Sequence, residues 1–153
     1  MPLDTGDTGF MLVATALVMI MTPGLAFFYG GLVSKKNVLT IMMQSYVSMG
    51  VTTILWVTVG YSLCFSGDVG GIIGNLDNAF LMGISPMDLF LGPEGTIPLL
   101  LFAVYQMMFA VITPALITGA FANRVTFKAY LIFLVAWQLF VYFPFVHMIW
   151  GGG

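Results

Sequence analysis

Residues 9–32 read GFMLVATALVMIMTPGLAFFYGGL, a stretch of 24 residues without a charged side chain. A helix needs about 20 predominantly apolar residues to cross the hydrocarbon core of a bilayer. Three further uncharged stretches of similar length follow, at about 39–65, 97–122 and 129–150. Because a spanning segment must satisfy its own backbone hydrogen bonds, these stretches predict four transmembrane helices. The expected fold is an all-α integral membrane protein, with residues 1–153 forming one membrane domain.

The composition excludes several classes of protein. Hydrophobic residues make up 60% of the chain and charged residues only 7%, whereas an ordinary soluble domain carries about 25% charged residues. The chain has no basic patch, so nucleic-acid binding has no support. Its one cysteine, Cys64, excludes an internal disulfide, and we expect it to be a small packing residue. Apart from methionines, Cys64 and His147 are the only soft ligands, which excludes a zinc-finger type of metal site. No cofactor is expected.

The charged residues are segregated along the chain. All the bases lie in the two short connections: Lys35, Lys36, Arg124 and Lys128. All the acids lie in the N-terminal tail or in the long connection at 66–96: Asp4, Asp7, Asp68, Asp77, Asp88 and Glu94. Alternating spans place both basic connections on one side, and the positive-inside rule makes that side cytoplasmic. We therefore expect a multi-pass protein of the cell membrane, with its N-terminus and the long connection outside the cytoplasm.

Two of the spans contain residues that disturb helices. Thr22-Pro23-Gly24 interrupts the first span and Thr113-Pro114 the third. Kinked membrane helices are tolerated where neighbours satisfy the freed backbone groups, so a bundle packed around something polar and simple helix bending both remain open. Small residues recur at helical spacing and indicate close helix packing. They are Ala115 and Gly119 in the third span and Ser45, Ser48 and Thr52 in the second.

The fourth span is rich in aromatic residues near its outer end: Tyr142, Phe143, Phe145 and Trp150. They are typical of an interfacial aromatic belt, or alternatively of a vestibule that attracts cations, since tryptophan has the best cation–π face. The only histidine, His147, lies in the same region. An ionisable group within a membrane span is a functional candidate, but its nearness to the interface would let it reach lipid headgroups. Structural and functional interpretations of His147 therefore both stay open.

Nothing in the sequence predicts an enzyme. The apolar stretches contain no pair of acids, and the chain has neither a Ser-His-Asp set nor a phosphate-binding glycine loop. If the spans enclose a pore, its walls would be almost free of charge. A bare cation would need carbonyl rings or carboxylates along its path, so such a pore favours a neutral or deprotonated permeant.

A set of motifs carries a resemblance to a known family. They are Met21-Thr22-Pro23-Gly24, Phe28-Tyr29-Gly30-Gly31-Leu32, Lys36-Asn37-Val38, Leu55-Trp56, Gly60-Tyr61-Ser62, Tyr105-Gln106-Met107-Met108-Phe109-Ala110, Ile112-Thr113 and His147-Met148-Ile149-Trp150-Gly151-Gly152-Gly153. In this order and spacing the chain resembles the N-terminal part of the Amt/Mep/Rh ammonium transporters, and most closely the Amt branch. The resemblance implies a homotrimer with about eleven helices per subunit, an inverted repeat and a narrow hydrophobic pore in each subunit.

The resemblance also implies roles for individual residues. Trp150 corresponds to the tryptophan of an outer site that recruits ammonium, and Phe109 to the first phenylalanine of the gate. Leu25, Tyr29 and Leu116 correspond to positions that line the pore. The implied mechanism is capture of ammonium by aromatic rings, loss of a proton at the gate, and passage of ammonia, because desolvating a charge in an apolar channel is expensive.

Several features are not transferred by the resemblance. His147 is not one of the family's paired pore histidines, which belong to later helices, and a family member would continue past Gly153. The expected partners are ammonium or ammonia, the lipid bilayer, two further copies of the chain and a cytoplasmic regulatory protein. Two alternatives remain: an ammonium sensor with the same membrane fold fused to a signalling domain, and a four-helix accessory subunit of a membrane complex.

Overall fold

The computed structural model describes residues 3–122 and 124–153, which form four apolar helical spans. The first span is α1 (Thr5–Leu32). The second comprises α2 (Val38–Leu55), the π-helical turn η1 (Trp56–Gly60) and α3 (Tyr61–Phe65). The third comprises α4 (Leu99–Ile117) and the 3-10 turn η4 (Thr118–Phe121). The fourth comprises α5 (Phe127–Trp137), the π-helical turn η5 (Gln138–Tyr142) and α6 (Phe143–Trp150).

All four spans of the described part are long and apolar enough to cross a membrane. Apart from two isolated bridges, no β-structure occurs in the ranges that the structure covers. The predicted all-α fold with four transmembrane helices is therefore confirmed.

Two spans begin earlier than the uncharged stretches predicted, because polar residues cap them. The Asp4 carboxylate accepts the backbone N–H of Asp7 at 2.8 Å, so α1 begins at Thr5. The Thr126 hydroxyl accepts the backbone N–H of Ala129 at 3.3 Å, so α5 begins at Phe127. Such caps satisfy N–H groups that have no partner within the helix. Charged residues are consequently found in the first turns of these helices.

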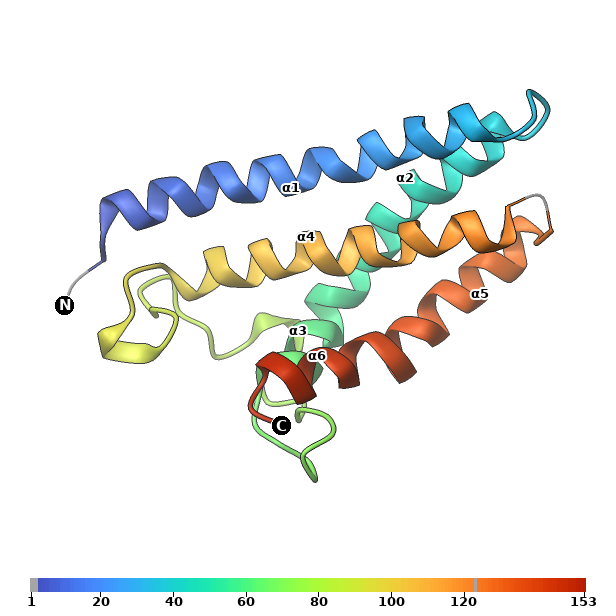
Figure 1. The fold of residues 1–153 in the computed structure, drawn as a ribbon. Helices are drawn as coiled ribbons and strands as arrows, with labels where there is room; N and C mark the ends of the chain where they lie inside the picture. The colour runs from blue at the N-terminus through green and yellow to red at the C-terminus, as the bar shows by residue number, and fades with distance from the viewer. Residues whose placement is uncertain (1–2, 123) are drawn as a thin grey trace.

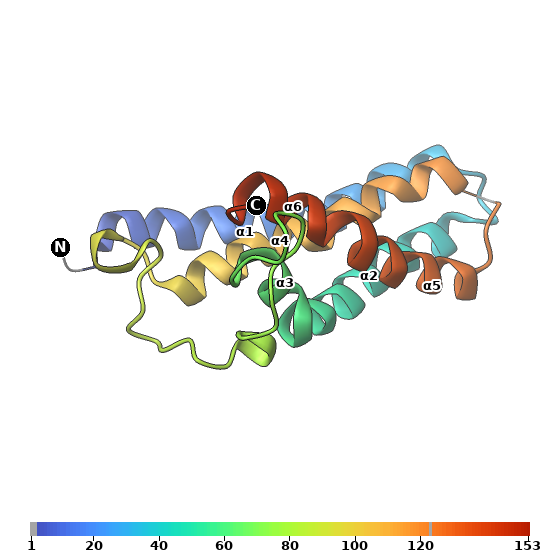
Figure 2. The same ribbon diagram turned by 90° about the horizontal axis from the view of Figure 1, so that it is seen from below.

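The helices form an elongated bundle (Figures 1 and 2). Helix α1 lies along α4 and meets α2 near the turn that joins them. Helix α4 also contacts α2, while α5 contacts α2, and α6 contacts α3 at the other end of the molecule. Helix α4 thus lies between α1 and the fourth span, and α1 is left at the flank of the bundle.

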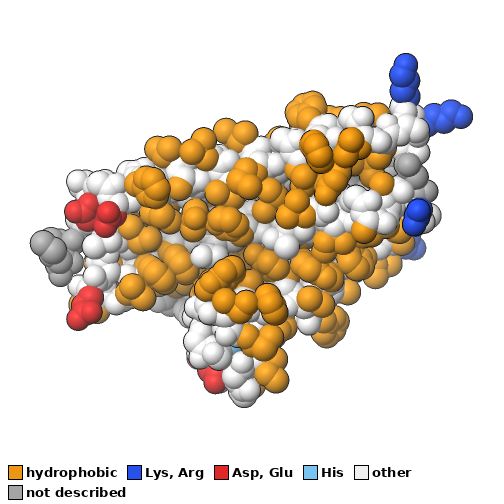
Figure 3. Space-filling view, viewed as in Figure 1, with side chains coloured by type: hydrophobic (Ala, Val, Ile, Leu, Met, Phe, Trp, Pro, Cys, Tyr) orange, Lys and Arg blue, Asp and Glu red, His pale blue; other side chains and the backbone are white. Residues whose placement is uncertain are grey.

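The charged side chains gather at opposite ends of the bundle (Figure 3). Lysine and arginine side chains lie at the end where α1 turns into α2 and α4 turns toward α5, called here the basic end. Acidic side chains lie toward the end that holds the N-terminus and the long connection, called here the acidic end. The intervening surface is predominantly hydrophobic, with large side chains exposed along α1 such as Phe10, Leu17 and Phe27. The prediction that both basic connections share one end is confirmed.

Two π-helical turns interrupt spans that the sequence predicts as continuous helices. The first residue of each turn lies in the core: Trp56 of η1 is 2% exposed, and Gln138 of η5 is fully buried. A π-helical turn shifts the helix face that follows it, and such turns are common at functional sites. The side-chain period of an ideal helix therefore does not predict the buried faces of these two spans.

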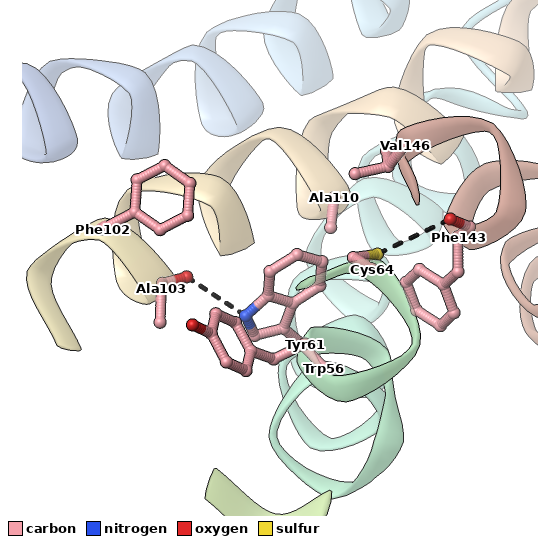
Figure 4. Close-up of a cluster of buried hydrophobic side chains, with 8 residues drawn as sticks. All are labelled: Trp56, Tyr61, Cys64, Phe102, Ala103, Ala110, Phe143 and Val146. Atoms are coloured by element: carbon pink, nitrogen blue, oxygen red, sulfur yellow. Dashed lines mark hydrogen bonds between the residues drawn. The ribbon is translucent and has the colours of Figure 1, made fainter. Parts of the chain in front are cut away.

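An aromatic core joins the second, third and fourth spans near the acidic end (Figure 4). The Trp56 indole donates its Nε1–H to the carbonyl of Ala103 in α4 at 3.1 Å. Its ring meets Phe143 of α6 edge to face, with centroids 6.0 Å apart. Gly60 makes this packing feasible, because a Cβ there would lie 2.7 Å from the Phe143 ring. Cys64 is fully buried in the same cluster, as expected for a packing residue.

The connection between α3 and α4 is held against the bundle by hydrogen bonds. It includes two short 3-10 turns, η2 (Ala79–Leu81) and η3 (Gly92–Glu94), and η2 contacts η1. The Ser66 hydroxyl lies 2.8 Å from the side-chain oxygens of both Asn75 and Asn78, and the Ser62 hydroxyl donates to the Asn75 carbonyl at 2.8 Å. The connection thus forms an ordered cover at the acidic end.

Candidate functional site

Two of the predicted pore-lining residues meet between α1 and α4. The Tyr29 hydroxyl donates to the backbone carbonyl of Leu116 at 3.0 Å. Gly119, one turn further along, leaves room for the tyrosine ring, because a Cβ there would lie 3.0 Å from it. Leu25 lies one turn before Tyr29 in α1 and is half-buried, and the Leu116 side chain is 49% exposed. The predicted close packing at Ala115 and Gly119 is confirmed.

A cavity of about 300 Å³ opens beside Tyr29 toward the basic end. Leu32, Ile41 and Ala122 contribute apolar side chains to its wall, and Ser34 contributes a hydroxyl. No charged side chain lines this cavity among the residues that the structure describes.

The predicted gate residue, Phe109, lies near the middle of α4 and is half-buried. Its ring packs edge to face against Tyr105, with centroids 5.0 Å apart. Its backbone carbonyl accepts a hydrogen bond from the Thr113 hydroxyl at 2.6 Å. The ring is therefore supported by an aromatic neighbour one turn away on the same helix.

The turn after Phe109 is stabilised by side chains from two other spans. Pro114 has no N–H, so the carbonyl of Ala110, four residues earlier, has lost its usual donor. Gln138 of η5 supplies a replacement, since its Nε2 donates to the Ala110 carbonyl at 2.9 Å and contacts the Thr52 hydroxyl at 3.0 Å. At the Pro114 kink the helices therefore pack around polar groups, as the first of the two interpretations predicts.

The small polar residues of α2 lie on the same buried face. Ser45, Ser48 and Thr52 are each no more than 1% exposed. The Ser48 hydroxyl donates to the Val111 carbonyl at 3.2 Å, one residue beyond the carbonyl that Gln138 contacts. The predicted packing face of the second span is confirmed, and it includes a hydrogen bond to the third span.

Trp150 ends α6 and is 63% exposed at the acidic end. It lines a cavity of about 360 Å³ together with Gly151, residues of the long connection and aromatic side chains of α3 and α4. Asp88 is the charged residue in this wall, where Phe90 and Phe102 stack at a centroid distance of 3.8 Å. Phe109 does not contribute to the cavity, so the structure does not bring the two predicted substrate-contacting residues to one cavity.

The four aromatic residues of the fourth span do not form one belt. Phe143 is fully buried in the aromatic core, and Tyr142 is partly buried and stacks on Trp137 with centroids 5.9 Å apart. Phe145 and Trp150 are exposed. The belt interpretation is therefore wrong for Phe143, because η5 shifts the helix face and turns this ring into the protein.

His147 is fully buried and faces the long connection instead of the headgroup region. Its Nδ1 lies 2.9 Å from the carbonyl oxygen of Cys64, and its Nε2 lies 3.1 Å from a carboxylate oxygen of Asp68. The expectation that it could reach lipid headgroups is wrong, because both ring nitrogens already have partners in the protein. Asp68 was not predicted as a partner, and 79 positions separate it from His147.

Two further residues of the site were missed in the sequence. Gln138 lies beside the Pro114 kink, and Asp88 lines the cavity at Trp150. Gln138 could have been found, since a long polar side chain within an apolar span needs a partner and Pro114 frees one. In the described ranges, no three His, Cys, Asp or Glu side chains come together as a metal site would require.

The sequence is similar to those of known ammonium transporters. The family model described as Ammonium Transporter Family matches residues 9–153. Ammonium transporter 1 of Dictyostelium discoideum is 49% identical over 151 residues, which cover 98% of this chain and 32% of that protein. An ammonium transporter of Bacillus subtilis is 48% identical, over 99% of this chain and 37% of that protein. The chain thus spans about a third of the length of these relatives.

Solved structures show the same likeness in three dimensions. The crystal structure of Candida albicans Mep2 superposes with a TM-score of 0.85 at 33% identity, covering 98% of this chain and 32% of that one. A structure described as a Sensor Amt Protein superposes with a TM-score of 0.81 at 26% identity, covering 95% of this chain and 34% of that one. The arrangement of the four spans is therefore one that known membrane proteins adopt.

Proposed function

The chain belongs to the ammonium transporter family, and on this premise we propose that it forms the N-terminal part of a protein that conducts ammonium or ammonia across the cell membrane. The observation that carries this proposal is the family match over residues 9–153, which includes every predicted site residue. The four apolar spans and the separation of acidic from basic ends support a membrane-spanning conduit.

In the proposed mechanism, Trp150 recruits ammonium at the acidic end. A cation near the face of an indole gains about 0.5–1 kcal/mol at an exposed site and more where water is excluded. Trp150 is 63% exposed and lines a cavity whose charged residue is the acid Asp88, so the charge around it suits a cation. Cation attraction, rather than anchoring in the headgroup region, is the role assigned to this ring.

Beyond Trp150 the proposed path is apolar. Phe109 acts as a gate, and Leu25, Tyr29 and Leu116 line the path on the side of α1 and α4. Moving a bare charge through such surroundings is expensive, which gives ammonium a reason to leave its proton at the gate and cross as ammonia. The proton returns to the outside or crosses by a separate route.

The assembly and orientation are part of the same proposal. We place the acidic end and the N-terminus outside the cytoplasm, because all four bases lie at the opposite end. Helix α1 exposes large apolar side chains along its length, which lipid or a neighbouring copy in a homotrimer would cover. The basic end would then be the side available to a cytoplasmic regulatory protein.

Neither alternative is favoured. Relatives at 46–49% identity are named ammonium transporters, whereas the structure described as a sensor is 26% identical. None of the relatives named above is described as an accessory subunit, so they do not support the accessory-subunit alternative. Ammonium transport is therefore the function that the chain supports best.

The direct test is uptake into liposomes that contain the protein expressed from its complete coding sequence. Ammonium should enter at a rate that saturates with concentration, while potassium should enter no faster than into protein-free liposomes, because a bare ion cannot shed its charge. The control is the same protein with Phe109→Trp, whose larger ring should reduce the maximal rate by about tenfold or more if this position gates the path. Equal ammonium uptake with and without protein would contradict the proposal.

A further inference from the structure

His147 has no role in the mechanism above, yet both of its ring nitrogens contact oxygen atoms of the protein. It lies one helical turn before Trp150 on α6 and is completely buried. Its ring points at two oxygen atoms of the segment that follows the second span, which are the Cys64 carbonyl at 2.9 Å and the Asp68 carboxylate at 3.1 Å. The histidine therefore joins the end of α6 to the start of the long connection.

Both partners of the ring are acceptors, and both are fixed in place. A ring N–H can donate to a carbonyl or to a carboxylate oxygen, so this geometry lets the imidazole join the two groups. The same carboxylate oxygen accepts the backbone N–H of Gly71 at 2.9 Å. Asp68 is itself 49% exposed, but this turn of the connection holds its carboxylate toward His147.

The glycines that follow Trp150 allow the backbone at residues 151–153 to pack closely against the same segment. A Cβ at Gly151 would lie 1.9 Å from the Cys64 carbonyl oxygen, and a Cβ at Gly153 would lie 2.6 Å from the Gly71 carbonyl oxygen. The backbone N–H groups of both glycines donate to the His147 carbonyl, at 2.9 and 3.1 Å. The backbone on either side of Trp150 is thus held by His147 and by the long connection.

We propose that His147 and Asp68 are positioning residues for Trp150: their contact fixes the end of α6 against the long connection and so sets the direction in which the indole faces the substrate. The inference rests on the proposed function of Trp150. Trp150 is largely exposed and lies at the last residue of its helix, so its own side-chain contacts do not hold it as Trp56 is held in the core. An aromatic face must be aimed at a cation to attract it.

The test separates capture of ammonium from transport. In liposomes, Asp68→Ala should raise the KM for ammonium by roughly fivefold, the factor expected from losing an exposed cation–π contact, and leave the maximal rate within about twofold. Asp68→Asn keeps an oxygen for His147 and Gly71 and should restore most of the affinity. Asp77→Ala is the matched control, because Asp77 lies in the same connection and makes its hydrogen bonds to Asn75 within that connection.

Two further variants show whether the effect passes through His147. His147→Gln should raise the KM as Asp68→Ala does, and the double variant should raise it no further, since residues that act through one contact are not additive. Effects that multiply would overturn the proposal. So would an unchanged KM in Asp68→Ala, or a loss of maximal rate and thermal stability at constant KM, which would leave these residues a structural role alone.

Hydrogen exchange gives a readout that does not depend on transport. The amides of Gly151 and Gly153 donate to the His147 carbonyl, so a peptide covering 143–153 should exchange faster in Asp68→Ala than in wild type, while peptides from α1 stay unchanged. Unchanged exchange in 143–153 would overturn the inference. If Trp150→Leu does not raise the KM, the proposed recruitment role fails; if it does and Asp68→Ala does not, only the positioning role fails.

Discussion

Helices α1 and α4 are almost equally apolar and lie side by side, yet they differ in how much of each the protein buries. In the most apolar stretch of each span, 17% of the residues of α1 are buried, compared with 44% of those of the span formed by α4 and η4. Helix α4 receives hydrogen bonds from Trp56, Ser48 and Gln138 on its backbone carbonyls, whereas α1 exposes a row of large side chains. Both helices are hydrophobic enough to lie in the membrane. Hydrogen bonds from neighbouring spans to its backbone distinguish α4, which lies inside the bundle, from α1.

Substituting matched alanines should give the largest difference between the two helices. Ala115 of α4 is fully buried, while Ala16 of α1 is exposed. Ala115→Leu should lower the free energy of unfolding by about 3 kcal/mol, because the extra methylenes have no space in a packed interior. Ala16→Leu should change it by less than about 0.5 kcal/mol. Thermal melting of the purified full-length variants measures both, and equal losses would contradict the difference in packing between α1 and α4.

Removing one polar contact of α4 should have a smaller effect. Gln138→Leu leaves the Ala110 carbonyl without its donor beside Pro114 and removes the partner of Thr52. An unsatisfied buried carbonyl costs about 1–3 kcal/mol, so we expect a loss of about 2 kcal/mol. Phe140→Leu is the control, because Phe140 lies in the same π-helical turn and is 80% exposed. A Gln138→Leu variant as stable as this control would show that the hydrogen bonds of Gln138 do not stabilise α4.

Much of this fold is predictable because its main determinants are local. Four uncharged stretches of sufficient length define the spans, and the placement of bases and acids predicts which connections share an end. The two earlier helix starts were missed because Asp4 and Thr126 extend the helices into charged residues by capping them. The π-helical turns were missed for a different reason: their extra residue leaves no mark in composition, and it decides whether Phe143 faces lipid or core.

The candidate site was predictable only in part. Resemblance to a family supplied the positions of Trp150, Phe109, Leu25, Tyr29 and Leu116, and the structure adds a hydrogen bond between the last two. The contact of His147 with Asp68 joins residues 79 positions apart, and its formation depends on how the long connection folds back. Nothing in the local sequence of either residue indicates the other. Positioning contacts of this kind require the three-dimensional arrangement.

In the proposed mechanism Trp150, exposed at the acidic end, captures ammonium before it enters an apolar path. The most direct test is the concentration dependence of ammonium uptake into liposomes by Trp150→Leu, beside Phe145→Leu, which alters another exposed ring of α6. Trp150→Leu should raise the KM by about fivefold to tenfold with a maximal rate near that of wild type, whereas Phe145→Leu should leave both the KM and the maximal rate unchanged. An unchanged KM in Trp150→Leu would contradict the proposed mechanism.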